Sequence, residues 1–142
     1  MNNYVATVKI DINAPAANVW RALTDPELVK QVMFGSEVVT DWQEGSDIVY
    51  RGEWQGKPFE DKGKIIKIVP EKQLIITHYS PMSGAEDVPE NYHTITYTLT
   101  ETDGKTTVEL SQDNNSDEAG KAESEKNWNM MLANLKRIAE EG

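Results

Sequence analysis

Apolar residues recur three and four positions apart between residues 117 and 140, the spacing that places side chains on one face of an α-helix. This stripe consists of Trp128, Met131, Leu132, Leu135, Ile138 and Ala139. Charged and amide side chains fill the positions between them and suit a face in water. Burying a large apolar side chain contributes roughly 1.5–3 kcal/mol, so the rest of the chain must supply an apolar surface about as long as the helix.

The start of this helix carries polar residues that suit a helix N-terminus. Asn115 or Ser116 can cap it, because a short polar side chain can accept a hydrogen bond from an unpaired amide of the first turn. Asp117 and Glu118 would then lie in the first turn, where the helix dipole favours negative charge.

The N-terminal third changes from a strand pattern to two short helices. Apolar and polar residues alternate over residues 4–12, which predicts a strand with one buried face. Pro15 and Pro26 each suit the first turn of a helix, and Asp25 is a candidate cap for the second one. Gly35 is a natural terminator of that second helix.

From Glu37 onward the pattern is that of strands separated by short turns. Six strands are predicted, at residues 38–42, 47–54, 59–69, 74–80, 92–100 and 106–112. Short connections, such as the turn at Asp103-Gly104, require neighbouring strands to pair antiparallel. The prediction is an α+β helix-grip fold over residues 1–142 as one domain. A curved antiparallel sheet of about seven strands wraps around the long C-terminal helix, with two short helices after the first strand.

Composition limits the classes of function. The 142 residues include no cysteine, which excludes disulfides, thiol catalysis and thiolate metal sites and suits a cytoplasmic location. The net charge of −10 argues against nucleic acid as a partner, because a phosphate backbone would be repelled. No apolar run is long enough for membrane insertion, and the first residues do not resemble a signal peptide. An acidic surface leaves a protein partner as an option.

Aromatic residues are the most suggestive candidates for a binding site. Several lie on segments that should face one another if the helix lies across the sheet, and they would line an apolar pocket whose hydroxyl and indole groups orient a ligand. The alternative is that these side chains simply fill the core. The predicted ligand-binding set is Phe34, Tyr50, Trp54, Tyr79, Tyr97, Trp128 and Met131.

The two histidines are the main candidates for catalysis. His78 and His93 lie on consecutive predicted strands, and either could act with Asp61 or Glu53 as an acid–base pair. A two-histidine metal site would need a third ligand such as Asp61 or Glu53, but no spacing motif supports such a site, so no metal is predicted. No nucleophile motif or phosphate-binding loop is present, and no cofactor is predicted.

The long loop at residues 81–89 has two interpretations. Loops of this length in compact domains are often functional, so it could form a lid over a pocket. Its acidic residues could equally form a solvated rim. The charged residues of the central strands, such as Arg51 and Lys62, are expected to form cross-strand pairs on the outer face.

Three parts of the chain carry recognisable motifs. The opening has IDINAP (residues 10–15) and VWRALTDP (residues 19–26). The central hairpin has GKIIKIVP (residues 63–70) and LIITH (residues 74–78), and the closing helix has Asn127-Trp128 with Leu132, Leu135 and Lys136. These segments resemble START-like (SRPBCC) domains, in particular those of the heat-shock-protein-90 ATPase activator homologue family. His78 and Asn127 depart from the tryptophan and glycine that are common in the family at these positions.

The resemblance implies a helix-grip fold with a cavity between the sheet and the long helix. It also implies binding or carriage of a small hydrophobic or aromatic ligand, since members of the wider superfamily hold apolar ligands there. Two alternatives remain open at this point. One is a cyclase or dehydratase that uses the same cavity, and the other is a co-chaperone-like interaction module.

Overall fold

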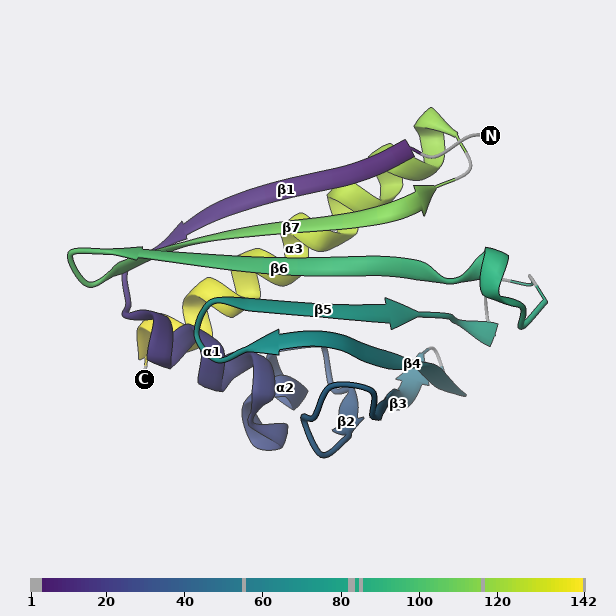
Figure 1. The fold of residues 1–142 in the computed structure, drawn as a ribbon, viewed down its shortest axis with the longest axis horizontal. Coiled ribbons are helices and arrows are strands. Elements are labelled where there is room, and N and C mark those ends of the chain that lie inside the picture. The colour runs from purple at the N-terminus through teal and green to yellow at the C-terminus, as the bar shows by residue number, and fades with distance from the viewer. Residues whose placement is uncertain (1–3, 55, 82–83, 85, 116, 142) are drawn as a thin grey trace.

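The computed structural model describes residues 4–54, 56–81, 84, 86–115 and 117–141, with Trp54 described by its backbone alone. The elements are β1 (Tyr4–Ile12), α1 (Ala16–Thr24), α2 (Pro26–Val32), β2 (Glu37–Val39), β3 (Asp47–Trp54), β4 (Lys57–Val69), β5 (Gln73–His78), η2 (Pro89–Asn91), β6 (His93–Thr102), β7 (Lys105–Asn115) and α3 (Glu118–Glu141). The strands form one antiparallel sheet in the order β1-β7-β6-β5-β4-β3-β2. Figure 1 shows α3 crossing behind this sheet, so the predicted helix-grip fold is confirmed.

The helices begin where the sequence supplies a proline or an acidic cap. Pro15 precedes α1, and Pro26 opens α2 while the Asp25 carboxylate accepts a hydrogen bond from the Glu27 amide at 3.0 Å. The cap of α3 lies one or two residues after the predicted positions, Asn115 or Ser116. Asp117 lies just before the helix and accepts from the Gly120 amide at 2.7 Å, whereas Asn115 turns back to the sheet, and Ser116 lies outside the described residues.

The long helix lies diagonally under one side of the sheet. It packs against β1 and β7 and, near its C-terminus, against α1 and α2. Two of its carboxylates accept backbone hydrogen bonds from β1 and the residue after it, Glu125 from Thr7 at 3.1 Å and Glu140 from Asn13 at 2.7 Å. Within the described part of the chain, no helix, α3 included, combines the length and hydrophobicity needed to cross a membrane.

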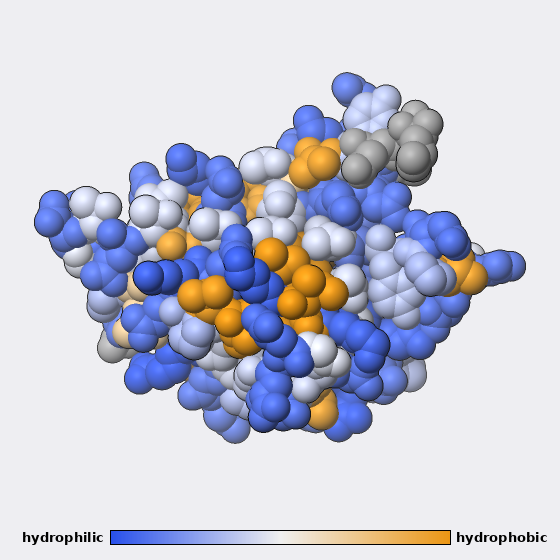
Figure 2. All heavy atoms as spheres, in the orientation of Figure 1, coloured by the Kyte–Doolittle hydropathy of each residue, from blue (hydrophilic) through white to orange (hydrophobic). Residues whose placement is uncertain are grey.

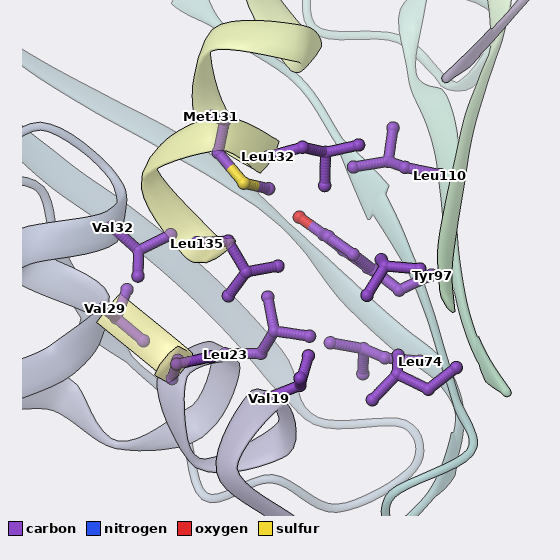
Figure 3. Packing of buried hydrophobic residues seen from close by; sticks show 14 of the residues in the cluster. Val19, Leu23, Val29, Val32, Leu74, Tyr97, Leu110, Met131, Leu132 and Leu135 are labelled. Carbon is purple, nitrogen blue, oxygen red and sulfur yellow. The ribbon is translucent and has the colours of Figure 1, made fainter. Parts of the chain in front are cut away.

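The core lies where α3, the short helices and the inner face of the sheet meet. Figure 3 shows Val19 and Leu23 of α1 beside Leu74 of the sheet, with Leu135 of α3 above them. Every second residue is buried from Ile95 to Leu99 in β6 and from Thr106 to Leu110 in β7, the period expected when one face of a sheet packs on the core. The opposite face, seen in Figure 2, is largely hydrophilic except for an apolar area over β4 and β5.

One strand differs from the sequence prediction. The first strand after the short helices spans three residues, Glu37–Val39, instead of five. The long strand β4 runs without a break, and its irregular register falls between Ile65 and Lys67. It requires glycine at position 63, because a Cβ there would lie 1.8 Å from the Thr77 carbonyl oxygen of β5.

Candidate functional site

A cavity of about 360 Å³ lies between the inner face of the sheet and α3. Residues of β3 to β7 line one side of it, residues of α3 line the other, and the connection from α2 to β2 contributes Met33, Phe34 and Ser36. The lining residues are Met33, Phe34, Ser36, Tyr50, Phe59, Asp61, Ile76, His78, Ile95, Tyr97, Gln112, Ser124, Asn127, Trp128 and Met131. Most are apolar or aromatic, with a few polar side chains among them, a composition typical of small-molecule sites.

Three predicted aromatics meet in this cavity. The rings of Tyr97 and Trp128 form an edge-to-face pair with centroids 6.4 Å apart and planes at 85°. Tyr50 lines the same cavity from β3. Figure 3 shows the Tyr97 hydroxyl pointing toward Met131 and Leu132 of α3. These side chains give the cavity aromatic walls with hydroxyl and indole groups, the arrangement predicted from the sequence.

Burial raises the pKa of the Tyr50 and Tyr97 hydroxyls, and in Tyr97 the neighbouring Tyr50 adds a smaller increase. The folded state thus holds both protons more tightly than the unfolded chain does. The resulting stabilisation is complete below the unfolded pKa of about 10 and is lost as pH rises above it, by up to about 1.4 kcal/mol per pH unit for each tyrosine. Urea unfolding midpoints should therefore fall steeply above about pH 10. Tyr50→Phe should flatten this decline, and an unchanged slope would contradict the assignment.

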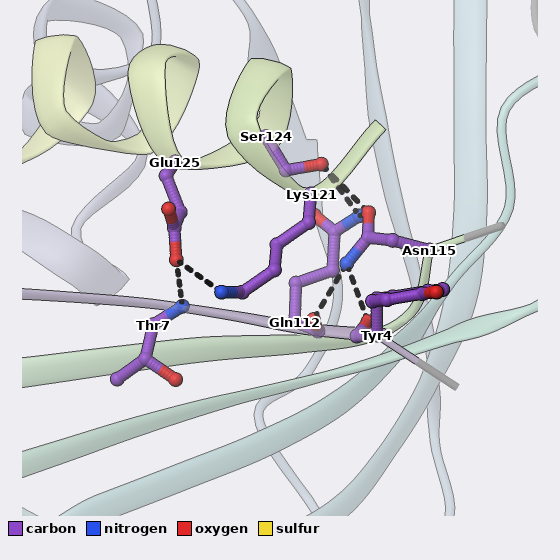
Figure 4. Close-up of polar contacts among 7 residues, drawn as sticks. All are labelled: Tyr4, Thr7, Gln112, Asn115, Lys121, Ser124 and Glu125. Carbon is purple, nitrogen blue, oxygen red and sulfur yellow. Dashed lines mark hydrogen bonds and ion pairs between the residues drawn. The ribbon is translucent and has the colours of Figure 1, made fainter. Parts of the chain in front are cut away.

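The indole of Trp128 is held in place by a network of polar side chains from the end of β7 and the first turns of α3. Its Nε1 donates to Gln112 Oε1 at 2.7 Å. Figure 4 shows Gln112 beside Asn115 and Ser124, and Ser124 Oγ donates to Asn115 Oδ1 at 2.8 Å. The Asn115 amide donates in turn to the carbonyl oxygens of Tyr4 and Gln112, at 2.9 and 3.0 Å. These hydrogen bonds hold the Trp128 ring in a fixed position in the cavity wall.

Asp61 and His78 form the polar pair of the cavity. His78 Nε2 lies 3.1 Å from Asp61 Oδ2, and the two side chains are 24% and 19% exposed. Asp61 Oδ1 is buried and has no hydrogen-bond partner among the described residues. Strand pairing explains the position, because Asp61 lies directly opposite Tyr50 in the β3–β4 ladder and shares its inward face. The structure thus brings together His78 and Asp61, two of the four residues named as candidates, whereas Glu53 is exposed and does not line the cavity.

The other predicted residues are placed as follows. Met131 and Phe34 line the cavity, with Phe34 61% exposed. His93 does not line it, and its Nδ1 instead donates to the Asp113 carbonyl oxygen at 2.8 Å. Tyr79 is buried but is not a lining residue. Of Trp54, the side chain lies outside the described part of the structure.

Tyr79 belongs to a cluster that fixes the long loop on the outer face of the sheet. Its ring stacks on Tyr92 at 5.3 Å, and Tyr92 donates to Asp87 Oδ1 at 2.6 Å. Asp87 also pairs with Lys62, whose hydrogen bond is the main cause of the lowered pKa of Asp87. None of the described residues of the loop lines the cavity. The contacts of Asp87 lie on the outer face of the sheet, as expected for a rim and not for a lid.

Sequence reasoning missed Gln112, Ser124 and Phe59 as lining residues. Gln112 follows Leu110 by two positions, so the alternation of β7 already placed it on the inner face. Among the described residues, no group of three potential metal ligands comes together.

Comparison with known proteins shows the family. Residues 13–140 match the family model described as "Activator of Hsp90 ATPase homolog 1-like protein". The solution structure of ChR145 from Cytophaga hutchinsonii is 49% identical with a TM-score of 0.86, covering 99% of this chain and 97% of that one. No functionally curated protein has a matching sequence.

Two further solved structures share the fold at low sequence identity. The solution structure of the Aha1 dimer from Colwellia psychrerythraea is 22% identical with a TM-score of 0.75, covering 99% of this chain and 97% of that one. CalU16 from Micromonospora echinospora is 21% identical with a TM-score of 0.71, covering 97% and 85%. The match over residues 13–140 settles the classification: the chain belongs to the Activator of Hsp90 ATPase homolog 1-like family.

Proposed function

We propose that the protein binds and carries a small, mainly apolar or aromatic molecule in the cavity between the sheet and α3. The observation that carries this proposal is the cavity itself, whose volume of about 360 Å³ lies within the range of roughly 300–1,000 Å³ of small-molecule sites. A core filled by protein atoms would have offered no such space. The side chains of Tyr50, Tyr97 and Trp128 supply apolar area, and the tyrosine hydroxyls can orient the ligand.

Access to the cavity can be blocked from the helix. Asn127 is exposed and lines the cavity, whereas Asn129, two residues further along α3, is exposed and does not line it. Asn127→Trp should fill the space near the opening and weaken ligand binding by about tenfold or more, which corresponds to about 1.4 kcal/mol. Asn129→Trp adds the same side chain outside the cavity and should leave binding unchanged.

The measurement is a thermal-shift and native mass spectrometry screen with fatty acids, flavonoids and sterols, followed by titration of the best binder into both variants. Equal affinity in the two variants, or no binder in the screen, would contradict the proposal. The same mass measurement tests the cyclase or dehydratase alternative, which the Asp61–His78 pair keeps open. A recovered ligand of changed mass would identify catalysis.

A further inference from the structure

Resting on the proposed binding function, we propose that the ligand is an organic ammonium: an apolar body with one positively charged nitrogen, held near Asp61 inside the aromatic walls. Three features of the cavity favour a positively charged ligand: the charges of its lining residues, the hydrogen bonds of Asp61 and the aromatic rings around Asp61.

The lining carries one acid and no permanent cation. Among the described residues of the cavity wall, Asp61 is the sole carboxylate, and none is lysine or arginine. The neighbouring Lys62 belongs to the outer-face cluster, where it pairs with Asp87. A ligand carboxylate would meet this negative charge in a partly buried place, where charges are screened less than in water. A ligand ammonium would be attracted.

Asp61 also has an unused hydrogen-bond acceptor. His78 Nε2 carries one N–H at most, and it lies within hydrogen-bond distance of Asp61 Oδ2. The other carboxylate oxygen, Oδ1, has no partner among the described residues. A buried carboxylate oxygen without a donor is unfavourable, and a charged donor forms the stronger kind of hydrogen bond. An ammonium group has up to three donors and can satisfy the carboxylate that His78 satisfies only in part.

The aromatic walls favour the same ligand. The faces of tyrosine and tryptophan rings attract cations, most strongly when the cation is removed from water. Tyr50 lies directly across the β3–β4 ladder from Asp61, and Tyr97 and Trp128 form the wall beyond it. Both tyrosine hydroxyls are neutral at neutral pH, because the ordinary tyrosine pKa lies near 10, and they can accept a hydrogen bond from the ammonium. A carboxylate together with aromatic rings is the chemistry that recognises an alkylammonium ion.

Three probes with one body and different head groups test the inference: 4-phenylbutylamine, 4-phenylbutanol and 4-phenylbutyrate. Each is titrated by calorimetry at neutral pH and low salt into wild type, Asp61→Asn and Glu60→Gln. Glu60 is the adjacent residue on the outer face of β4, so Glu60→Gln removes the same charge from the surface and leaves the cavity intact. A nuclear magnetic resonance spectrum of each variant establishes that it is folded.

We expect wild type to bind the amine about tenfold or more tightly than the alcohol, and the carboxylate most weakly. Asp61→Asn should bring the amine and alcohol affinities together with little change for the alcohol, and Glu60→Gln should keep the wild-type ranking. The inference is overturned if the amine has no advantage in wild type, or if Asp61→Asn retains the advantage. The wild-type ranking decides the matter should Asp61→Asn not fold.

The proposed function fails separately from this inference. If the alcohol or the carboxylate binds and is displaced in Asn127→Trp, the cavity is a binding site and only its charge preference is refuted. If wild type binds none of the three probes and none of the broader panel of lipids and flavonoids, both proposals fall.

Discussion

Leu135→Ala is expected to lower the free energy of unfolding by about 2–5 kcal/mol, the range for truncating a buried leucine. Leu135 has 0% exposure and lies on the buried stripe of α3, facing the short helices and the inner sheet (Figure 3). Removing its side chain leaves a void at the junction of these three parts. Because α3 closes the core, the loss should appear in the global unfolding transition, measured as the urea midpoint.

Lys136→Ala is the matched control on the next position of the same helix. Its ammonium pairs with Glu140 one turn further along, and such helix-surface pairs contribute about 0.3–0.5 kcal/mol. The expected change is correspondingly small. Comparable urea midpoints for the two variants would show that the stripe has been assigned to the wrong face of α3.

Gly63→Ala is expected to cost about 3 kcal/mol, the upper part of the usual range for forcing atoms into a packed interior. The added Cβ would lie 1.8 Å from the Thr77 carbonyl oxygen, which is backbone and cannot rotate away. Either β4 or β5 must shift, and that movement would disturb the ladder that carries Asp61 and His78. Urea unfolding measures the loss of stability, and ligand titration measures the displacement of the pair.

Gly52→Ala serves as the comparison on the neighbouring strand β3. There the Cβ would approach the ring of Phe59 at 3.3 Å, and a side chain can yield by a few tenths of an ångström. The expected loss is about 1 kcal/mol, close to that of a typical single substitution. If Gly52→Ala proves as damaging as Gly63→Ala, backbone contact is not what fixes glycine at position 63.

The periodic parts of the chain were the predictable ones. The stripe from Trp128 to Ala139 and the alternation of β1 each specify one buried face, and together with short turns they leave few arrangements besides a sheet on a helix. The residue that caps the N-terminus of α3 was less predictable. Asn115, Ser116 and Asp117 are all good caps by residue type, and only the hydrogen bonds of the Asn115 side chain to Tyr4 and Gln112 exclude Asn115 from that role.

The candidate site was predictable in most of its aromatics, whereas the sequence left open which histidine pairs with which acid. Tyr50, Tyr97 and Trp128 follow from alternation and helical spacing. Tyr79 could have been separated from them, because it is adjacent to His78 and neighbouring strand residues point to opposite faces. The contact between His78 and Asp61 spans strands β4 and β5, so it depends on a register that composition and periodicity do not determine.

The two carboxylates that α3 extends to Thr7 and Asn13 have a consequence for self-association. A lateral strand of a sheet ordinarily exposes free amides on which another chain can extend the ladder. Here the Glu125 carboxylate occupies the Thr7 amide within β1, Glu140 occupies the Asn13 amide just after it, and the opposite margin consists of the three residues of β2. A chain that added a strand beside β1 would have to displace the Glu125 carboxylate from Thr7 first.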